Sequence, residues 1–164
     1  MILVAVGASE FPFDRLLRAI DKLPEGEPLV VQHGPSEVRP AHAHCIPFVP
    51  QETLAQLVRE ARVIITHAGV GSILLSLTNG KRPCVVPRLG RFGETVDDHQ
   101  LDSARRFAEA GLVTLVENPD HLSDAIAFAE TDPILPPLGE AQLVGELRTY
   151  LDAVVGRRRS PAPR

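Results

Sequence analysis

The chain has 164 residues, of which 44% are hydrophobic and 23% are charged, a composition typical of one globular domain. Its formal net charge of -4 argues against a dedicated nucleic-acid-binding protein, because such proteins usually present a basic face. The stretch after Met1 is too short and too soon charged for a signal peptide, and no apolar run reaches the length of a membrane span, so we expect a cytoplasmic protein.

Apolar runs of strand length alternate with segments of helical spacing along the chain. In chain order, the pattern predicts strands over residues 2–6, 29–32, 46–49, 63–66, 84–86 and 112–116, and helices over 13–23, 51–61, 72–78, 100–110, 121–129 and 140–155. Residues 35–44 and 88–97 are predicted to be loops, and residues 133–137 to link the last two helices. Because the strands are continuously apolar, we expect a parallel sheet that is covered on both faces.

The sequence therefore predicts one Rossmann-like, doubly wound α/β domain over residues 1–156. A basic tail over 157–164, with four arginines and two prolines, is predicted to be disordered. Ligands of doubly wound sheets bind outside the carboxyl ends of the strands. The segments predicted to line that edge are Gly7, Gly34, 48–51, 67–72 and 88–100.

Residues 63–72, Val-Ile-Ile-Thr-His-Ala-Gly-Val-Gly-Ser, are the most informative stretch. A β-branched run ends in a glycine-broken turn, and a helix opens at Ser72. Glycines let the backbone approach a ligand, and the unpaired amides of a helix N-terminus favour an anion. We interpret Gly69, Val70, Gly71 and Ser72 as a phosphate loop and His67 as a ligand for a phosphate or sugar oxygen. The alternative is a structural turn in which Ser72 is the N-cap and His67 bonds a neighbouring loop.

A polar cluster, Asp97-Asp98-His99-Gln100, opens a later helix. The Asp98 carboxylate can accept hydrogen bonds from sugar hydroxyls, and the Gln100 amide can both donate and accept. The alternative role of either aspartate is to cap the helix. His99 is equally suited to contact the sugar, to point into the core or to face a partner.

Arg88 and Arg91 lie in the loop near the predicted phosphate site. An arginine there could stabilise the charge of a departing nucleoside diphosphate without a metal, whereas the alternative is two solvated surface arginines. Asp-x-Asp is absent and the histidines lack carboxylate or thiolate partners, so we predict no metal, and no cofactor other than a nucleotide-sugar as substrate. Cys45 and Cys84 are predicted to be buried free thiols in a reducing compartment.

In this order and spacing, several short motifs make the chain resemble the C-terminal domain of family-28 glycosyltransferases over roughly residues 1–130. These motifs are Val6-Gly7, Phe11-Pro-Phe-Asp-Arg-Leu16, Val31-Gln-His-Gly34, Phe48-Val-Pro-Gln51, His67-Ala-Gly-Val-Gly-Ser72, Gly80-Lys-Arg-Pro83, Val86-Pro87 and His99-Gln100. The resemblance is strongest to single-domain members: the cytosolic donor-binding subunit of two-subunit N-acetylglucosaminyltransferases and the bacterial paired exopolysaccharide glycosyltransferases.

This resemblance implies one half of a GT-B glycosyltransferase, the half that holds the UDP-sugar donor. By likeness, the loop before Ser72 carries the diphosphate, Phe48 to Gln51 match the segment that touches uracil, and Asp98, His99 and Gln100 match the segment that holds the sugar. The acceptor site and the catalytic base would come mostly from a membrane-anchored partner, which would place the chain at the inner face of the plasma membrane. The C-terminal helix could hold that partner.

The expected function is therefore the donor-binding subunit of an inverting, metal-independent glycosyltransferase. It would move N-acetylglucosamine or a similar sugar from a UDP-sugar to a lipid-linked or polysaccharide acceptor. Relatives often carry a ribose-binding Glu where this chain has Leu75, which supports an alternative: a non-catalytic nucleotide-binding or scaffold domain with a degenerate donor site. A fragment of a sugar-nucleotide epimerase is a weaker alternative, and a homodimer could replace the partner subunit.

Overall fold

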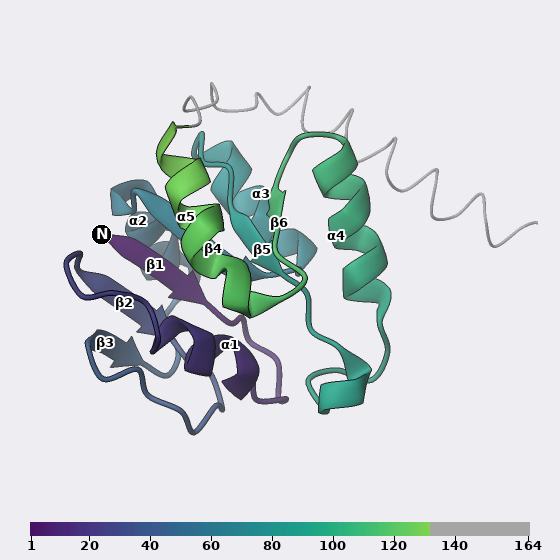
Figure 1. The fold of residues 1–164 in the computed structure, drawn as a ribbon, viewed down its shortest axis with the longest axis horizontal. Coiled ribbons are helices and arrows are strands. Elements are labelled where there is room, and N and C mark those ends of the chain that lie inside the picture. The colour runs from purple at the N-terminus through teal and green to yellow at the C-terminus, as the bar shows by residue number, and fades with distance from the viewer. Residues whose placement is uncertain (132–164) are drawn as a thin grey trace, which may run out of the picture.

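A six-stranded parallel β-sheet forms the centre of the molecule, with helices on both of its faces (Figure 1). The structure is a computed structural model that describes residues 1–131. The predicted helix 140–155, its linker and the tail 157–164 lie outside the described residues. The elements are β1 (Ile2–Ala5), α1 (Asp14–Ile20), β2 (Leu29–Gln32), β3 (Ala43–Ile46), α2 (Gln51–Glu60), β4 (Val63–His67), α3 (Val70–Thr78), β5 (Cys84–Val86), η1 (Gly90–Phe92), α4 (His99–Glu109), β6 (Thr114–Leu115), η2 (Pro119–His121) and α5 (Leu122–Thr131).

The strand order is β3-β2-β1-β4-β5-β6, which reverses direction between β1 and β4. Ile2 in β1 pairs with both Leu29 of β2 and Val63 of β4, so β1 is central and hydrogen-bonded on both sides. The chain leaves β1 for a helix on one face and leaves β4 for a helix on the other. This point of reversal is where doubly wound sheets open a crevice for ligands.

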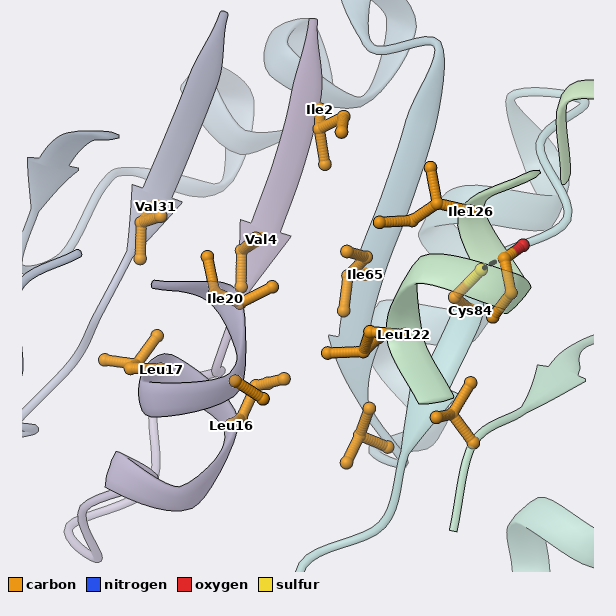
Figure 2. Close-up of a cluster of buried hydrophobic side chains, with 14 of the residues drawn as sticks. Ile2, Val4, Leu16, Leu17, Ile20, Val31, Ile65, Cys84, Leu122 and Ile126 are labelled. Atoms are coloured by element: carbon orange, nitrogen blue, oxygen red, sulfur yellow. Dashed lines mark hydrogen bonds between the residues drawn. The ribbon is translucent and has the colours of Figure 1, made fainter. Parts of the chain in front are cut away.

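One face of the sheet is covered by α1 and α5, which enclose the larger hydrophobic core (Figure 2). Side chains of both helices point toward the strands there. Those labelled in the figure are Leu16, Leu17, Ile20, Leu122 and Ile126 from the helices, and Ile2, Val4, Val31, Ile65 and Cys84 from the strands. The Cys84 thiol is buried beside the Ala125 carbonyl oxygen at 3.7 Å. Burial raises the pKa of Cys84 to about 12, so this thiol is unreactive at neutral pH.

The other face is covered by α2, α3 and α4. Leu3 and Ile64 point to this face and pack against Val58 of α2, whereas their neighbours Val4 and Ile65 point to the first face. Because successive residues of a strand alternate between faces, a sheet covered twice needs apolar residues at every position. The continuously apolar strands in the sequence follow from this requirement.

The third strand was predicted in the wrong place. It runs over Ala43–Ile46 rather than 46–49, and three of the four predicted residues lie in the segment that leads to α2. Pro47 has no N–H for a strand ladder, and β3 is an edge strand, where the exposed His44 is tolerated. The helix predicted over 13–23 ends at Ile20. The chain turns at residues 21–22, before Leu23, which precedes a proline and is therefore disfavoured in a helix.

Helix α3 also begins earlier than predicted, at Val70 instead of Ser72. Gly69 is its N-cap residue, with an extended backbone, so the alternative that Ser72 is the N-cap is wrong. Among the helices of residues 1–131, none is long and apolar enough to cross a membrane.

Candidate functional site

In a doubly wound sheet the ligand crevice is expected at the reversal of strand order, which here lies between the segments that follow β1 and β4. Gly7 comes two residues after β1, and His67 is the last residue of β4. Adding a Cβ to Gly7 would place it 2.4 Å from Cε1 of His67, and adding one to Gly69 would place it 2.2 Å from Nε2. Since real contacts are never so short, the imidazole occupies space that only two glycines leave open. His67 is thereby fixed between the two turns.

The His67 imidazole is neutral at physiological pH. Desolvation and the neighbouring Arg88 cation lower its pKa from 6.5 to about 4, although a hydrogen bond to the Ala5 backbone acts in the opposite direction. The Thr66 hydroxyl lies 3.4 Å from Nδ1. A neutral ring next to a crevice has one nitrogen that donates and one that accepts, so it can bond a polar ligand without adding a charge.

The first turn of α3 opens beside this histidine. No side chain caps the helix, and its first turn contains no acidic residue. The first backbone N–H groups of a helix have no intrahelical acceptor, so the amides of Val70 and Gly71 are left for solvent or a ligand. Because these amides lie at the positive end of the helix dipole, the site favours an anion.

Gly71 is a glycine that the fold does not need. It is exposed and helical, and a Cβ built on it would meet no atom within 4 Å. Alanine within a helix is more stable than glycine by about 0.5–1 kcal/mol. What glycine gives this position is open space in front of the free amides.

The polar cluster at the start of α4 is bonded to the loop that follows β5. The Gly90 amide donates to Oδ1 of Asp98 at 2.7 Å, and the Arg88 amide donates to Oε1 of Gln100 at 3.3 Å. Asp98 occupies the N-cap position but makes no side-chain cap bond. Asp97 instead accepts from the His99 amide at 3.3 Å and also contacts Nδ1 of His99. Asp98 and Gln100 are thus positioned by backbone amides, while Asp98 and His99 stay exposed.

Arg88 is buried, with 1% of the residue exposed, so the alternative of a solvated surface arginine is wrong for it. Its guanidinium donates to backbone carbonyls at 2.8–3.2 Å, namely those of Val6, Phe11, Pro12 and Glu94. Its central carbon lies 4.5 Å from the centroid of the Phe13 ring. These contacts keep the guanidinium in the interior, where its charge reaches the crevice through space. Arg91, by contrast, is exposed and lies over Phe92.

Desolvation lowers the pKa of Arg88 to about 10, and the nearby Glu94 carboxylate opposes this shift. A pKa of about 10 leaves the side chain protonated at neutral pH. The candidate site therefore combines a neutral imidazole, free helix amides and a buried cation behind them. Within residues 1–131, no group of three or more His, Cys, Asp or Glu side chains is arranged to hold a metal ion.

Phe48 and Gln51 lie at the same edge of the sheet, beyond β3, and they do not contact His67. Phe48 is 55% exposed, and Gln51 begins α2. Two groups that sequence reasoning missed hold this edge together. Gln32, 4% exposed, accepts from the Gly7 amide at 3.1 Å and donates to the Pro47 carbonyl at 2.9 Å. The other is the buried Glu94. The position of Gln32, a polar residue at the end of an apolar strand, could have identified it from the sequence. No feature of the sequence distinguishes Glu94 from a surface glutamate.

A family model, glycosyltransferase family 28 C-terminal domain, matches residues 1–133. The chain belongs to this family. Its match covers every element described above, including the crevice, the first turn of α3 and the polar cluster of α4. Among curated proteins, none matches the chain.

Solved structures with the same fold include three glycosyltransferases. The glycotransferase of kitacinnamycin is 21% identical with a TM-score of 0.58, and the match covers 98% of this chain and 44% of that one. CalG4, the calicheamicin glycosyltransferase, is 20% identical with a TM-score of 0.58, at 93% and 43% coverage. MurG of Acinetobacter baumannii is 22% identical with a TM-score of 0.54, at 79% and 41% coverage. These likenesses confirm the predicted fold, the C-terminal half of a GT-B glycosyltransferase, and the chain spans less than half of each protein.

Gly69→Ala should destabilise the protein by about 2 kcal/mol, because the new methyl group would overlap the His67 ring. Chemical denaturation would measure the change in free energy of unfolding. Gly71→Ala is the matched control and should leave stability unchanged or raise it by up to about 1 kcal/mol. The steric explanation also requires that His67→Ala restore part of the loss in Gly69→Ala; a double variant no more stable than the single one would contradict it.

Acidification should weaken the fold between pH 6.5 and 4. The folded protein takes up the His67 proton only near pH 4, whereas the unfolded chain takes it up near the ordinary value of 6.5. The unfolded state thus binds more protons in this window. As the pH decreases, the free energy of unfolding falls by at most about 1.4 kcal/mol per pH unit for this group. In urea denaturation at several pH values, His67→Gln should show a shallower fall than the wild type. Parallel curves would mean that the His67 imidazole is not the source of the pH dependence.

Proposed function

We propose that the chain is the donor-binding part of an inverting, metal-independent glycosyltransferase. It would hold a UDP-sugar, N-acetylglucosamine or a close relative, for transfer to a lipid-linked or polysaccharide acceptor. The observation that carries the proposal is Gly71: the first turn of α3 keeps a glycine where the fold would prefer alanine, and thereby leaves its free amides open. Membership of the glycosyltransferase 28 family makes a nucleotide-sugar the expected anion.

The diphosphate would bind over the loop Gly69 to Ser72, at the free amides of Val70 and Gly71, with His67 beside it. A neutral imidazole can donate to a phosphate oxygen from one nitrogen. The Arg88 cation lies close enough to His67 to lower the pKa of that ring, so its field also acts on an anion bound there. A fixed positive charge of this kind stabilises the charge that develops on a departing nucleoside diphosphate, the role that a metal ion has in other transferases.

The sugar would bind at the start of α4, where Asp98, His99 and Gln100 offer carboxylate, imidazole and amide groups. The uracil would bind near Phe48 and Gln51, because Phe48 presents an exposed aromatic face at the same edge of the sheet. The nucleotide and the sugar would thus contact different elements on either side of the crevice.

Acceptor binding and the catalytic base are assigned to a second, membrane-anchored subunit. Support comes from the resemblance to paired glycosyltransferases, in which a second subunit carries the acceptor site, and from the family model, which describes a C-terminal domain. A cytoplasmic chain held at the inner face of the plasma membrane by this subunit is the arrangement that follows. A homodimer that mimics the two-domain enzyme is the competing arrangement.

Leu75 favours a second candidate function, a nucleotide-binding or scaffold domain without catalysis. This residue packs partly buried against the cluster of Leu3, Val58, Ala61 and Ile64. An apolar side chain on this surface of α3 accepts no hydrogen bond from a ribose. The two candidates differ in whether a sugar adds affinity to the nucleotide.

Calorimetric titration with UDP, UDP-N-acetylglucosamine, UDP-glucose and GDP-mannose separates these candidates. One UDP-sugar should bind more tightly than UDP, and Gln100→Ala should reduce its affinity about fivefold to tenfold, as expected for one lost hydrogen bond. Gly71→Ala should weaken UDP itself while the thermal midpoint stays the same or rises. If GDP-mannose bound more tightly than the UDP-sugars, the donor nucleotide would be GDP and not UDP. If none of the compounds bound, the result would favour the scaffold function.

The isolated chain should transfer little sugar, because a GT-B cleft needs two halves. A radiolabelled UDP-sugar and a lipid-linked acceptor, incubated with the purified chain alone and with the acceptor-binding subunit, would measure this dependence. Transfer at full rate by the isolated monomer would refute the two-subunit arrangement. Transfer that rises with the square of chain concentration would identify the homodimer instead.

A further inference from the structure

Glu94 is a carboxylate that the loop between β5 and α4 buries almost completely. It is 3% exposed, although it lies in an eleven-residue stretch, 88–98, whose other members include the exposed Phe92 and Val96. Glutamate is rarely buried unless it is paired. The contacts of Glu94 therefore indicate what the loop needs it for.

The carboxylate of Glu94 has partners in α1 and at the start of its own loop. Arg15 of α1 donates from Nε and Nη2 to the two carboxylate oxygens, at 2.8 and 2.9 Å. The Leu89 amide donates to Oε2 at 3.0 Å, and Arg15 Nη2 also donates to the Pro87 carbonyl at 2.8 Å. The Glu94 carboxylate thus joins the start of its own loop to α1, an element 79 residues away in sequence.

The rest of the loop closes around this pair. The Glu94 backbone carbonyl accepts from Arg88 at 3.1 Å, so the same residue is held at its backbone and its side chain. The guanidinium of Arg15 lies 4.9 Å from the Phe92 ring centroid. The proposed sugar-binding groups are attached directly to this loop, since Asp98 accepts from Gly90 and Gln100 accepts from Arg88.

We propose that Glu94 is a positioning residue for donor-sugar recognition. It touches no ligand; its ion pair with Arg15 fixes loop 88–98, and the loop fixes the side chains of Asp98 and Gln100. The inference rests on the proposed function. It adds that affinity for the sugar is set by a carboxylate on the opposite side of the loop from the sugar.

Stability alone does not explain this pair. Replacing a buried ion pair by apolar residues of similar volume is often neutral or stabilising, so a charge pair here is weak evidence for a purely structural role. The pair Arg105–Glu117 provides the contrast. It has the same two-bond geometry, at 2.8 and 3.0 Å, but its side chains are 51% and 47% exposed and it does not hold loop 88–98.

The position of the pair predicts a split between two ligands. The diphosphate is assigned to the first turn of α3, which Glu94 does not contact, whereas the sugar is assigned to groups bonded to loop 88–98. Arg88 begins this loop, but carbonyls outside it, those of Val6, Phe11 and Pro12, also hold its guanidinium. Loosening the loop should therefore weaken a UDP-sugar much more than UDP itself. A variant that merely destabilises the fold would weaken both ligands together.

The test compares Glu94→Gln with Glu117→Gln, the matched control, in the full chain. Calorimetry would measure the affinities for UDP and for the UDP-sugar that the wild type prefers, and hydrogen exchange would follow the amides of residues 88–98. Glu94→Gln should reduce UDP-sugar affinity about fivefold to tenfold and UDP affinity less than about twofold, with faster exchange in the loop. Glu117→Gln should match the wild type in all three.

If Glu94→Gln does not fold, Arg15→Met removes the same ion pair from the other side and keeps the apolar stem against Phe92. Retained preference for the UDP-sugar, or an equal loss for both ligands, would overturn the positioning role and leave donor binding intact. A wild type that binds neither ligand would instead overturn the proposed function, and this inference with it. The two failures are therefore distinguishable.

Discussion

The guanidinium of Arg88 is shielded from water and meets backbone carbonyls in place of a carboxylate. An unpaired ion in a protein interior is strongly unfavourable, so its stability depends on how completely those carbonyls replace water. They come from the end of β1, the loop before α1 and loop 88–98, with the Phe13 ring beneath. The three segments must keep their places together, because the buried Nε of Arg88 already has no partner and each further carbonyl lost makes the buried charge less favourable.

The positive charge of Arg88 also acts on the candidate site. Desolvation, together with this cation, lowers the pKa of His67 and keeps the imidazole neutral, and the two glycines around the ring keep it in place. The amides of α3 and the polar groups of α4 are each held by a different set of contacts. Such a division lets one part of a ligand be recognised by backbone and charge and another part by side chains.

Prediction from sequence succeeded where the local pattern determines the structure. The apolar strands β2 and β5 have the predicted bounds, and the doubly wound sheet follows from the alternation of elements. It failed at β3, where edge position tolerates a polar residue such as His44. For Arg88 it left open the alternative of a solvated surface side chain, which the structure excludes. The four carbonyls that bury Arg88 come from residues 6 to 94, and no local pattern carries that information. The same holds for Glu94, whose partner lies in α1.

Gly71 has a consequence for anyone who redesigns this protein. A method that scores only how well each residue suits the backbone would replace it with alanine, since the helix gains about 0.5–1 kcal/mol and nothing is displaced. Selection for heat resistance would favour the same change. Position 71 is thus where optimisation of the fold and preservation of the ligand site give opposite answers, and a thermostable version should be engineered with that residue held fixed.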